Sequence, residues 1–184
     1  TPDGKPDLTA PAPKSADGKP DFSGVWQMRL AIAYIQNIVA DLKTTEIMPW
    51  ANKLFRERVS NHGKDDPWTI GCLPGGPRLI VGSRPMTPWV KITQIPNVIT
   101  LLYEDLSYRQ IFLDGRALPA DPTPSFMGYS VGRWEGDTLV VESTGFNERT
   151  WLDFGGHPHT EALRTTERFH RRNVGAIDLQ VTLE

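Results

Sequence analysis

Residues 89–113 read WVKITQIPNVITLLYEDLSYRQIFL, and this stretch decides the fold class. Three short runs rich in β-branched and aromatic residues occupy 89–93, 98–103 and 108–113, and turn-forming residues separate them. Strands that follow one another at a spacing of roughly 8–12 residues, with no helix between them, are typical of a sandwich or barrel. The stretch therefore predicts three consecutive antiparallel strands.

The segments on both sides extend this pattern. Residues 128–134 and 138–144 flank Glu135-Gly136-Asp137 and predict a tight hairpin. Two longer strands are expected at 161–171 and 176–183, and a first strand is expected to start at 24–26. Sequential hairpins without helical crossovers indicate an all-β protein, with an antiparallel up-and-down meander closing into a small barrel around an interior pocket.

One helix is expected at 49–61, where Pro49 suits the first helical position and Gly63 suits the end. Apolar residues recur on one side of it, so we expect it to pack on a barrel face or across the barrel mouth; they are Trp50, Leu54, Phe55 and Val59. Residues 63–88 are dense in Pro and Gly and predict a long irregular loop.

Residues 1–22 contain two similar Asp-Gly-Lys-Pro-Asp segments and further prolines, which predicts a surface arm ahead of a single barrel domain at 23–184. The chain opens at Thr1 without Met on this leader, as a mature exported protein does after its signal is removed. We therefore expect a periplasmic or secreted location. The strand at 176–183 ends without a turn, so a further segment is expected after it.

Composition excludes several classes of partner. The chain has 184 residues with 20 basic and 22 acidic side chains, a formal charge of −2, and no cluster of Lys or Arg. Nucleic acid is therefore not an expected partner. No window approaches the roughly 20 apolar residues of a membrane span. The single cysteine, Cys72, cannot form an internal disulfide, and we expect it to be buried.

Gly24-Val25-Trp26, at the start of the first predicted strand, resembles the Gly-x-Trp signature of the lipocalins. The resemblance implies a calycin-like barrel whose base is closed by Trp26 and covered by a basic side chain from the last strands. Arg168 or Arg171 could supply that cation–π contact.

A second resemblance is more specific than the Gly-x-Trp motif. It rests on three segments: 128–142 (GYSVGRWEGDTLVVE), 149–153 (RTWLD) and 157–163 (HPHTEAL). They resemble a family of uncharacterised exported proteins of environmental bacteria such as acidobacteria, many of which carry the same Asp-Gly-Lys-Pro-Asp leader. The resemblance covers most of the chain and implies export, but it brings no activity. It also implies that the final strand continues further.

His157, His159 and Glu161 alternate along the chain, so on an extended segment they would share one face. Two imidazoles and a carboxylate could bind a divalent metal with positions left open for substrate. Alternatively, Pro158 and the preceding glycines favour a loop whose imidazoles bond the backbone. Asp153 with either histidine could also act in metal-free general acid–base catalysis. A cupin site fits poorly, because the Glu follows too soon and no later segment supplies a fourth ligand.

The same region gathers polar and aromatic groups suited to a ligand pocket. The expected ligand-binding residues are Asn147, Trp151, Arg109, Tyr129 and Arg164. On the strand after the histidines, Arg164 and Arg168 share one face while Glu167 and Phe169 share the other. Either face would make the interior partly polar, and an inward Arg would favour a carboxylate-bearing ligand.

The leading hypothesis is an exported lipocalin-like barrel that binds a small organic molecule in a partly polar pocket, with residues 151–161 at the rim. An enzyme, either a lyase, an isomerase or a hydrolase, would use the same pocket with His157 and His159 and with Asp153 or Glu161. A docking module of the cell envelope, using residues 1–22, is the third possibility. Sequence alone leaves the oligomeric state open.

Overall fold

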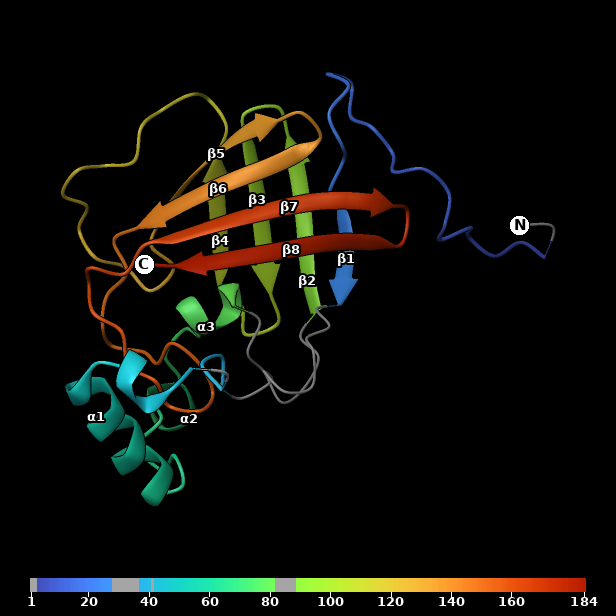
Figure 1. Ribbon diagram of the computed structural model, residues 1–184. Helices are drawn as coiled ribbons and strands as arrows, with labels where there is room; N and C mark the ends of the chain where they lie inside the picture. The colour runs from blue at the N-terminus through green and yellow to red at the C-terminus, as the bar shows by residue number, and fades with distance from the viewer. Residues whose placement is uncertain (1–2, 28–36, 41, 82–88) are drawn as a thin grey trace.

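The fold is a curled sheet of eight strands in a computed structural model that describes residues 3–27, 37–40, 42–81 and 89–184. Each strand pairs with the next one along the chain (Figure 1). The strands are β1 (Gly24–Gln27), β2 (Trp89–Ile95), β3 (Val98–Tyr103), β4 (Tyr108–Phe112), β5 (Tyr129–Glu135), β6 (Thr138–Thr144), β7 (Thr165–Asn173) and β8 (Ala176–Leu183). The prediction of a mostly β protein is confirmed.

The sheet forms a half-barrel rather than a closed barrel. In Figure 1, β1–β4 make one layer and β5–β8 make a second layer whose strands run across the first. Within the described residues, the order of paired strands ends at β1 and at β8, and these two strands do not pair with each other. The expected closure therefore does not occur in this part of the chain, and the two layers face one another across an open corner.

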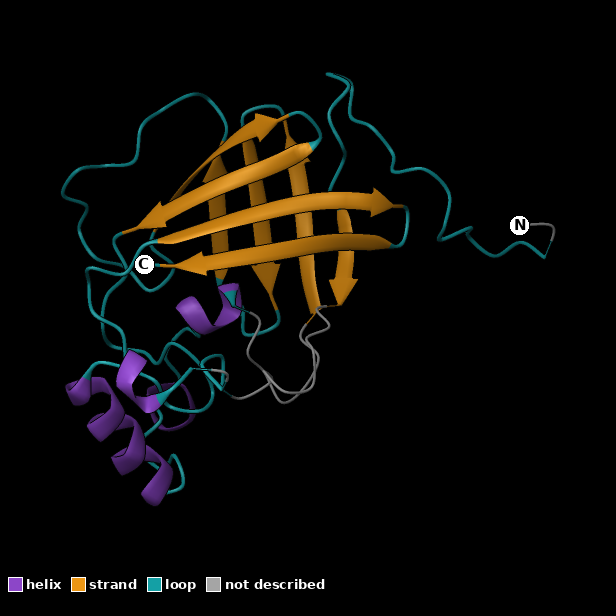
Figure 2. Cartoon of the chain, viewed as in Figure 1, coloured by secondary structure: helices purple, strands orange, loops and turns teal. Residues whose placement is uncertain are grey.

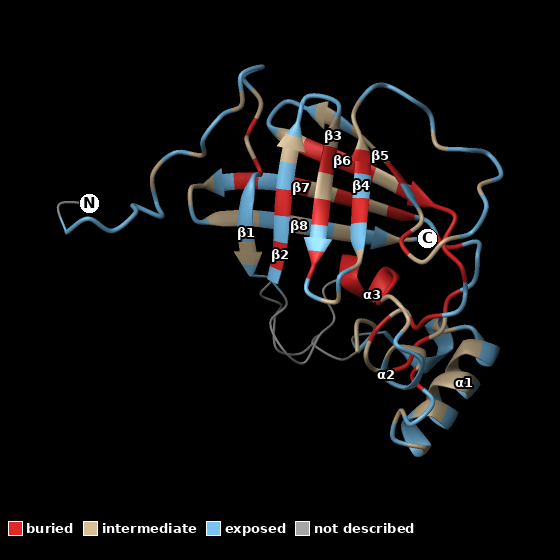
Figure 3. Cartoon of the chain, turned by 180° about the vertical axis from the view of Figure 1, so that it is seen from behind, coloured by how far each residue is buried: buried red, intermediate tan, exposed pale blue. Residues whose placement is uncertain are grey.

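Alternation along the strands places one set of side chains between the layers. In β2, β3 and β4 the buried positions are every second residue, as Figure 3 shows from the outer side of this layer. The residues that this pattern buries are Val90, Ile92, Ile99, Leu101, Tyr103, Arg109 and Ile111. In β7 the alternation buries Thr165, Glu167, Phe169 and Arg171. The face of β7 that carries Glu167 therefore points inward.

The join between β4 and β5 corrects the purely antiparallel prediction. Ile111 and Phe112 pair in parallel with Ser130 and Val131, whereas all other neighbouring strands pair antiparallel. A parallel pair requires the chain to return to the end from which it started. The long connection at 113–128 provides that return, and it loops out beside the sheet in Figure 1.

Helices are more numerous than the single one predicted. α1 (Pro49–Ser60) confirms the expected helix, and the structure adds α2 (Pro67–Gly71), α3 (Pro77–Ile80) and the short 3-10 helix η2 (Thr44–Glu46). α2 and α3 lie within the segment expected to be irregular; its last part, 82–88, is outside the described residues. Pro67 and Pro77 occupy the first position of these helices. A backbone N–H at that position has no acceptor within the helix, so the N–H that proline lacks is not needed there. In the described residues, no helix combines the length and apolarity needed to span a bilayer.

The helices gather beyond one end of the sheet (Figure 2). α1 neither covers a barrel face nor closes the mouth, which corrects that prediction; it packs instead on the loop that follows β6, where the Phe55 ring stacks on His157. α3 is the helix beside the strand ends, and Leu79 and Ile80 from it are buried in the barrel core. Cys72, at the end of α2, is exposed rather than buried.

The opposite end of the half-barrel is closed by aromatic residues from the N-terminal part of the chain. The guanidinium of Arg171 lies 4.8 Å from the Trp26 ring centre, which confirms the predicted cation–π contact. The Trp26 indole donates to the carbonyl of Phe22, and the Phe22 ring stacks on Trp134 at 5.7 Å. Because Phe22 is only 2% exposed, the last residue of the predicted arm is part of the core.

We predict that Phe22→Ala lowers the free energy of unfolding by about 3–5 kcal/mol, because truncating a buried aromatic ring removes apolar contact and leaves a cavity. Val25→Ala, three residues later on the exposed side of β1, should change it by less than about 0.5 kcal/mol. Urea unfolding of both variants measures the difference. Equal stabilities would mean that Phe22 is not part of the cooperative core.

Candidate ligand-binding site

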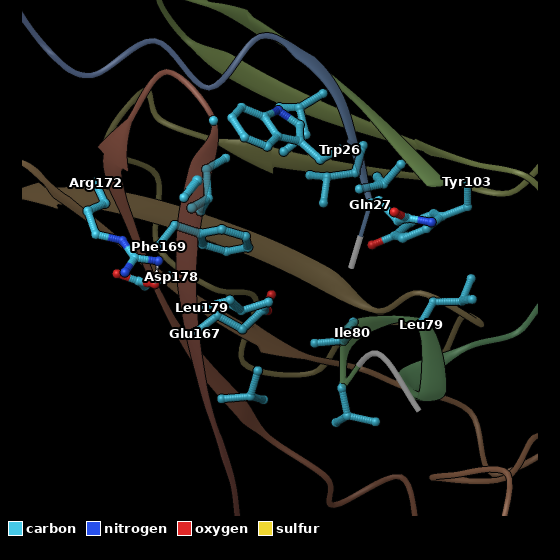
Figure 4. Close-up of a pocket in the computed structure, with 18 residues that line it drawn as sticks. Trp26, Gln27, Leu79, Ile80, Tyr103, Glu167, Phe169, Arg172, Asp178 and Leu179 are labelled. Carbon is cyan, nitrogen blue, oxygen red and sulfur yellow. Dashed lines mark ion pairs between the residues drawn. The ribbon is translucent and has the colours of Figure 1, made fainter. Parts of the chain in front are cut away.

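A pocket of about 390 Å³ lies between the two layers of the half-barrel, beside β1 and β8, the two end strands of the sheet in the described residues. Figure 4 shows the side chains that line it. Most are apolar and come from β2, β3, β7, β8 and α3, with Trp26 from β1 at one side. They owe their inward direction to the alternation of each strand, so the half-barrel itself positions the pocket.

Of the described residues, five with polar side chains line the pocket: Gln27, Tyr103, Glu167, Arg172 and Asp178. Two of them, which come from opposite layers, are buried. Tyr103 at the end of β3 and Glu167 in the middle of β7 both line the pocket, although they are 7% and 1% exposed. Figure 4 shows both of them among the side chains that line the pocket. Among the described side chains, the Tyr103 hydroxyl and the Glu167 carboxylate are therefore the buried polar groups that line the pocket.

Glu167 is held by Arg109, which comes from β4 in the opposite layer. Arg109 donates from both terminal nitrogens to the two carboxylate oxygens, at 2.9 Å and 2.5 Å. It also donates from Nε to Ser130 Oγ at 2.8 Å and from Nη2 to Ser143 Oγ at 2.7 Å. A bidentate pair of this kind satisfies both charges without water.

The environment fixes the protonation of this cluster. Burial acts to lower the pKa of Arg109, but the charge and hydrogen bonds of Glu167 outweigh it and raise that pKa above its ordinary value. Burial raises the pKa of Tyr103 to about 12, although the neighbouring guanidinium of Arg109 opposes the shift. At neutral pH Arg109 therefore remains a cation and Tyr103 a protonated phenol.

The edge of the pocket carries a second, exposed ion pair. Arg172 and Asp178 lie on β7 and β8 and are 3.0 Å apart (dashed in Figure 4). Both side chains are more than half exposed, so the pair is screened by solvent and contributes little to stability.

The predicted catalytic residues lie in the loop between β6 and β7. Asp153 and His157 are brought together, with Oδ2 of Asp153 2.8 Å from Nδ1 of His157. Asp153 is fully buried and also accepts the backbone N–H groups of Ile38, Gly156 and His157. A carboxylate with this many donors holds the surrounding backbone in place, and neither residue lines the pocket.

Aromatic and cationic contacts complete this loop. Trp151 is 3% exposed, and the guanidinium of Arg58 lies 4.8 Å from its ring centre. Arg58 also donates to the carbonyl of Gly156. On the other side, Arg78 of α3 lies 5.7 Å from the Trp151 ring and forms a bidentate pair with Asp66. Trp151 therefore connects α1 and α3 rather than facing the pocket as predicted.

His159 is buried apart from this pair. Its Nδ1 lies 3.3 Å from the carbonyl of Thr160, and its Nε2 is buried without a hydrogen-bond partner in the described residues. Burial lowers the pKa of His159, although that carbonyl opposes the shift. Its imidazole is therefore neutral at pH 7.

The His157, His159 and Glu161 arrangement is not the shared face that an extended strand would give. These residues precede β7 in a loop with turns, and Glu161 is exposed while both histidines are buried. In the described part of the chain, no three His, Cys, Asp or Glu side chains are grouped so that they could bind a metal. The donor set that a divalent metal would need is not assembled by these three residues.

The other predicted ligand-binding residues divide between interior and surface. Arg109 points inward but reaches Glu167 rather than the pocket. Asn147 is 9% exposed and its side chain accepts the backbone N–H of Arg149, which places it in a local turn. Tyr129 and Arg164 are exposed. None of these four lines the pocket.

Sequence reasoning missed Tyr103 and Glu167 as site residues. The signal for Glu167 was present, because it falls between Thr165 and Phe169 at the period of two that marks one face of a strand. A charged residue on an otherwise apolar face is a candidate for an internal partner. For Tyr103, the last residue of an apolar strand, no such signal exists.

Comparison of the chain with protein-family models, with curated proteins and with solved structures gave no match. The assignment of a function therefore depends on the geometry of the pocket and of the Asp153 loop.

We predict that Glu167→Gln lowers the free energy of unfolding by about 3–5 kcal/mol, because it leaves the Arg109 charge buried without its counter-ion. The double variant Arg109→Met with Glu167→Leu should recover much of this loss, because it removes both charges. Arg168→Ala, which breaks the exposed pair with Glu135, serves as control and should cost less than about 1 kcal/mol. Urea unfolding measures the three variants. This role is contradicted if Glu167→Gln lowers the free energy of unfolding by no more than Arg168→Ala does.

We also predict that His159 makes stability depend on pH. Because its pKa is lowered in the folded state, the unfolded chain takes up a proton first as the pH falls below the ordinary value of 6.5. The stability advantage of the wild type over His159→Asn should therefore be constant above pH 7.5 and should shrink from about pH 6.5 downward. Unfolding curves from pH 8 to 5 measure it, and an advantage that grows in acid would contradict the assignment.

Proposed function

We propose that this protein binds a small, mainly apolar organic molecule in the pocket of its half-barrel. The observation that carries the proposal is the pocket of about 390 Å³ between the layers. Pockets for small organic ligands have volumes of roughly 300–1,000 Å³, are mostly apolar and contain a few polar groups that orient the ligand. The pocket has this size and composition.

The way the pocket is bounded supports the same function. Leu101 of β3, Phe169 of β7 and Leu179 of β8 line it from both layers, and α3 adds Leu79 and Ile80. Apolar surface of this kind gains about 25 cal/mol for each Å² that a ligand removes from water. The fold also keeps the pocket partly open, because β1 and β8 do not pair in the described residues.

The enzymatic alternative has less support from the geometry. Asp153 and His157 form the carboxylate–imidazole contact that acid–base catalysis uses, but they lie outside the pocket residues. The Asp153 oxygens are occupied by three backbone N–H groups as well as by the imidazole. Their contacts favour a structural role, in which the pair fixes the loop between β6 and β7.

We predict that Leu101→Trp weakens binding of a neutral fluorescent reporter, such as 1-aminoanthracene, at least tenfold, because the larger ring fills the pocket. Leu102→Trp is the matched control, because Leu102 follows Leu101 in β3 and its side chain is 42% exposed on the outer face of the strand. Fluorescence titration measures both affinities.

A second blocking variant keeps this test decisive if Leu101→Trp overpacks the core and fails to fold. Ala176→Trp, at the start of β8, enters the pocket from a partly exposed position that tolerates a larger side chain more readily. The proposal is wrong if the wild type binds no reporter, or if the folded pocket variants bind it as tightly as Leu102→Trp.

A further inference from the structure

We infer that the pocket selects neutral molecules that carry a hydroxyl group, and that it discriminates against carboxylates and amines. This inference rests on the proposed function and specifies the chemical class of its ligand. The feature that decides it is the state of the polar groups at the inner side of the pocket, Tyr103 and the Arg109–Glu167 pair.

The Arg109 guanidinium has no donor available for the carboxylate of an acidic ligand. It does not line the pocket, and its donors go to the two oxygens of Glu167, to Ser130 and Ser143, and to the Tyr103 hydroxyl. An incoming carboxylate would meet the carboxylate of Glu167 instead. Removing an ionised group from water without a partner is strongly unfavourable, so acids are disfavoured.

Binding of a cationic ligand is also disfavoured. Both oxygens of Glu167 already accept from Arg109, and the opposite charges of the pair compensate one another at close range. An ammonium group would lose its hydration and gain only a shared acceptor. The charge of the protein at this position is therefore matched to a ligand of zero charge.

A hydroxyl group matches what remains. Tyr103 lines the pocket, and its hydroxyl oxygen accepts from the Arg109 guanidinium. Because a guanidinium has no acceptor, the phenol proton remains available to a ligand, and the raised pKa of Tyr103 keeps that proton in place at neutral pH. Glu167 retains lone pairs beyond those that Arg109 uses, because each carboxylate oxygen can accept more than one hydrogen bond. A ligand hydroxyl can accept from Tyr103 and donate toward Glu167, while its hydrocarbon part lies against the apolar lining.

The test compares the wild type with four molecules that share one alkyl chain: 1-octanol, octanoate, octylammonium and 1-chlorooctane. Their affinities are measured at pH 7 by displacement of 1-aminoanthracene. We expect 1-octanol to bind at least tenfold more tightly than each of the others. The inference is overturned if octanoate or octylammonium binds as tightly as 1-octanol.

Substitution at Tyr103 tests the group that makes the distinction. Tyr103→Phe should reduce the preference for 1-octanol over 1-chlorooctane to within about threefold, which corresponds to loss of one hydrogen bond. Tyr108→Phe is the matched control, because Tyr108 is 61% exposed on β4, and it should keep the wild-type preference. An unchanged preference in Tyr103→Phe overturns the inference.

The outcomes separate this inference from the proposed function. If all four molecules displace the reporter with similar affinity, the pocket binds apolar molecules and only the selectivity is wrong. If none displaces it and the reporter itself does not bind, the proposed function fails and the inference fails with it. Should Tyr103→Phe not fold, the ranking of the four molecules by the wild type alone decides.

Discussion

The ion pair between Arg109 and Glu167 is the interaction on which the interior of this half-barrel depends. It joins β4 of one layer to β7 of the other, and serines from β5 and β6 share the same guanidinium. Buried charges are stable only when they are paired and hydrogen-bonded. Four strands must therefore keep their register, because a shift of one residue in β4 or β7 would turn one partner outward and leave the other buried alone.

The same pair divides the interior of the barrel into a filled part and an open part. Ile111 and Val141 are fully buried and do not line the pocket, whereas Tyr103 and Glu167 do. The polar cluster thus forms part of the pocket wall. Because its charges cancel one another, the wall offers polarity without net charge, and this property shapes the choice of ligand that we infer.

The loop between β6 and β7 shows how residues suited to catalysis can serve a structural purpose. Asp153 accepts three backbone N–H groups in addition to the His157 imidazole, which is stacked on Phe55 of α1. These bonds attach the helical region to the sheet at a place with little regular secondary structure. The sequence pattern suggested a shared face for His157, His159 and Glu161. These residues lie outside any strand, in a loop with turns at 154–155 and 161–162, so the alternation of a strand on which that interpretation depended does not apply.

The amino-acid sequence by itself determined the strands, because alternation and turn residues are local properties that each segment carries alone. It also predicted α1 and the contact of Trp26 with a basic side chain, but it left open which face of β7 points inward. Only the tertiary structure decided the parallel pairing of β4 with β5, the open corner between β1 and β8, and the partner of Arg109. These features depend on which distant segments meet across the two layers, and no periodicity within a single segment encodes that choice.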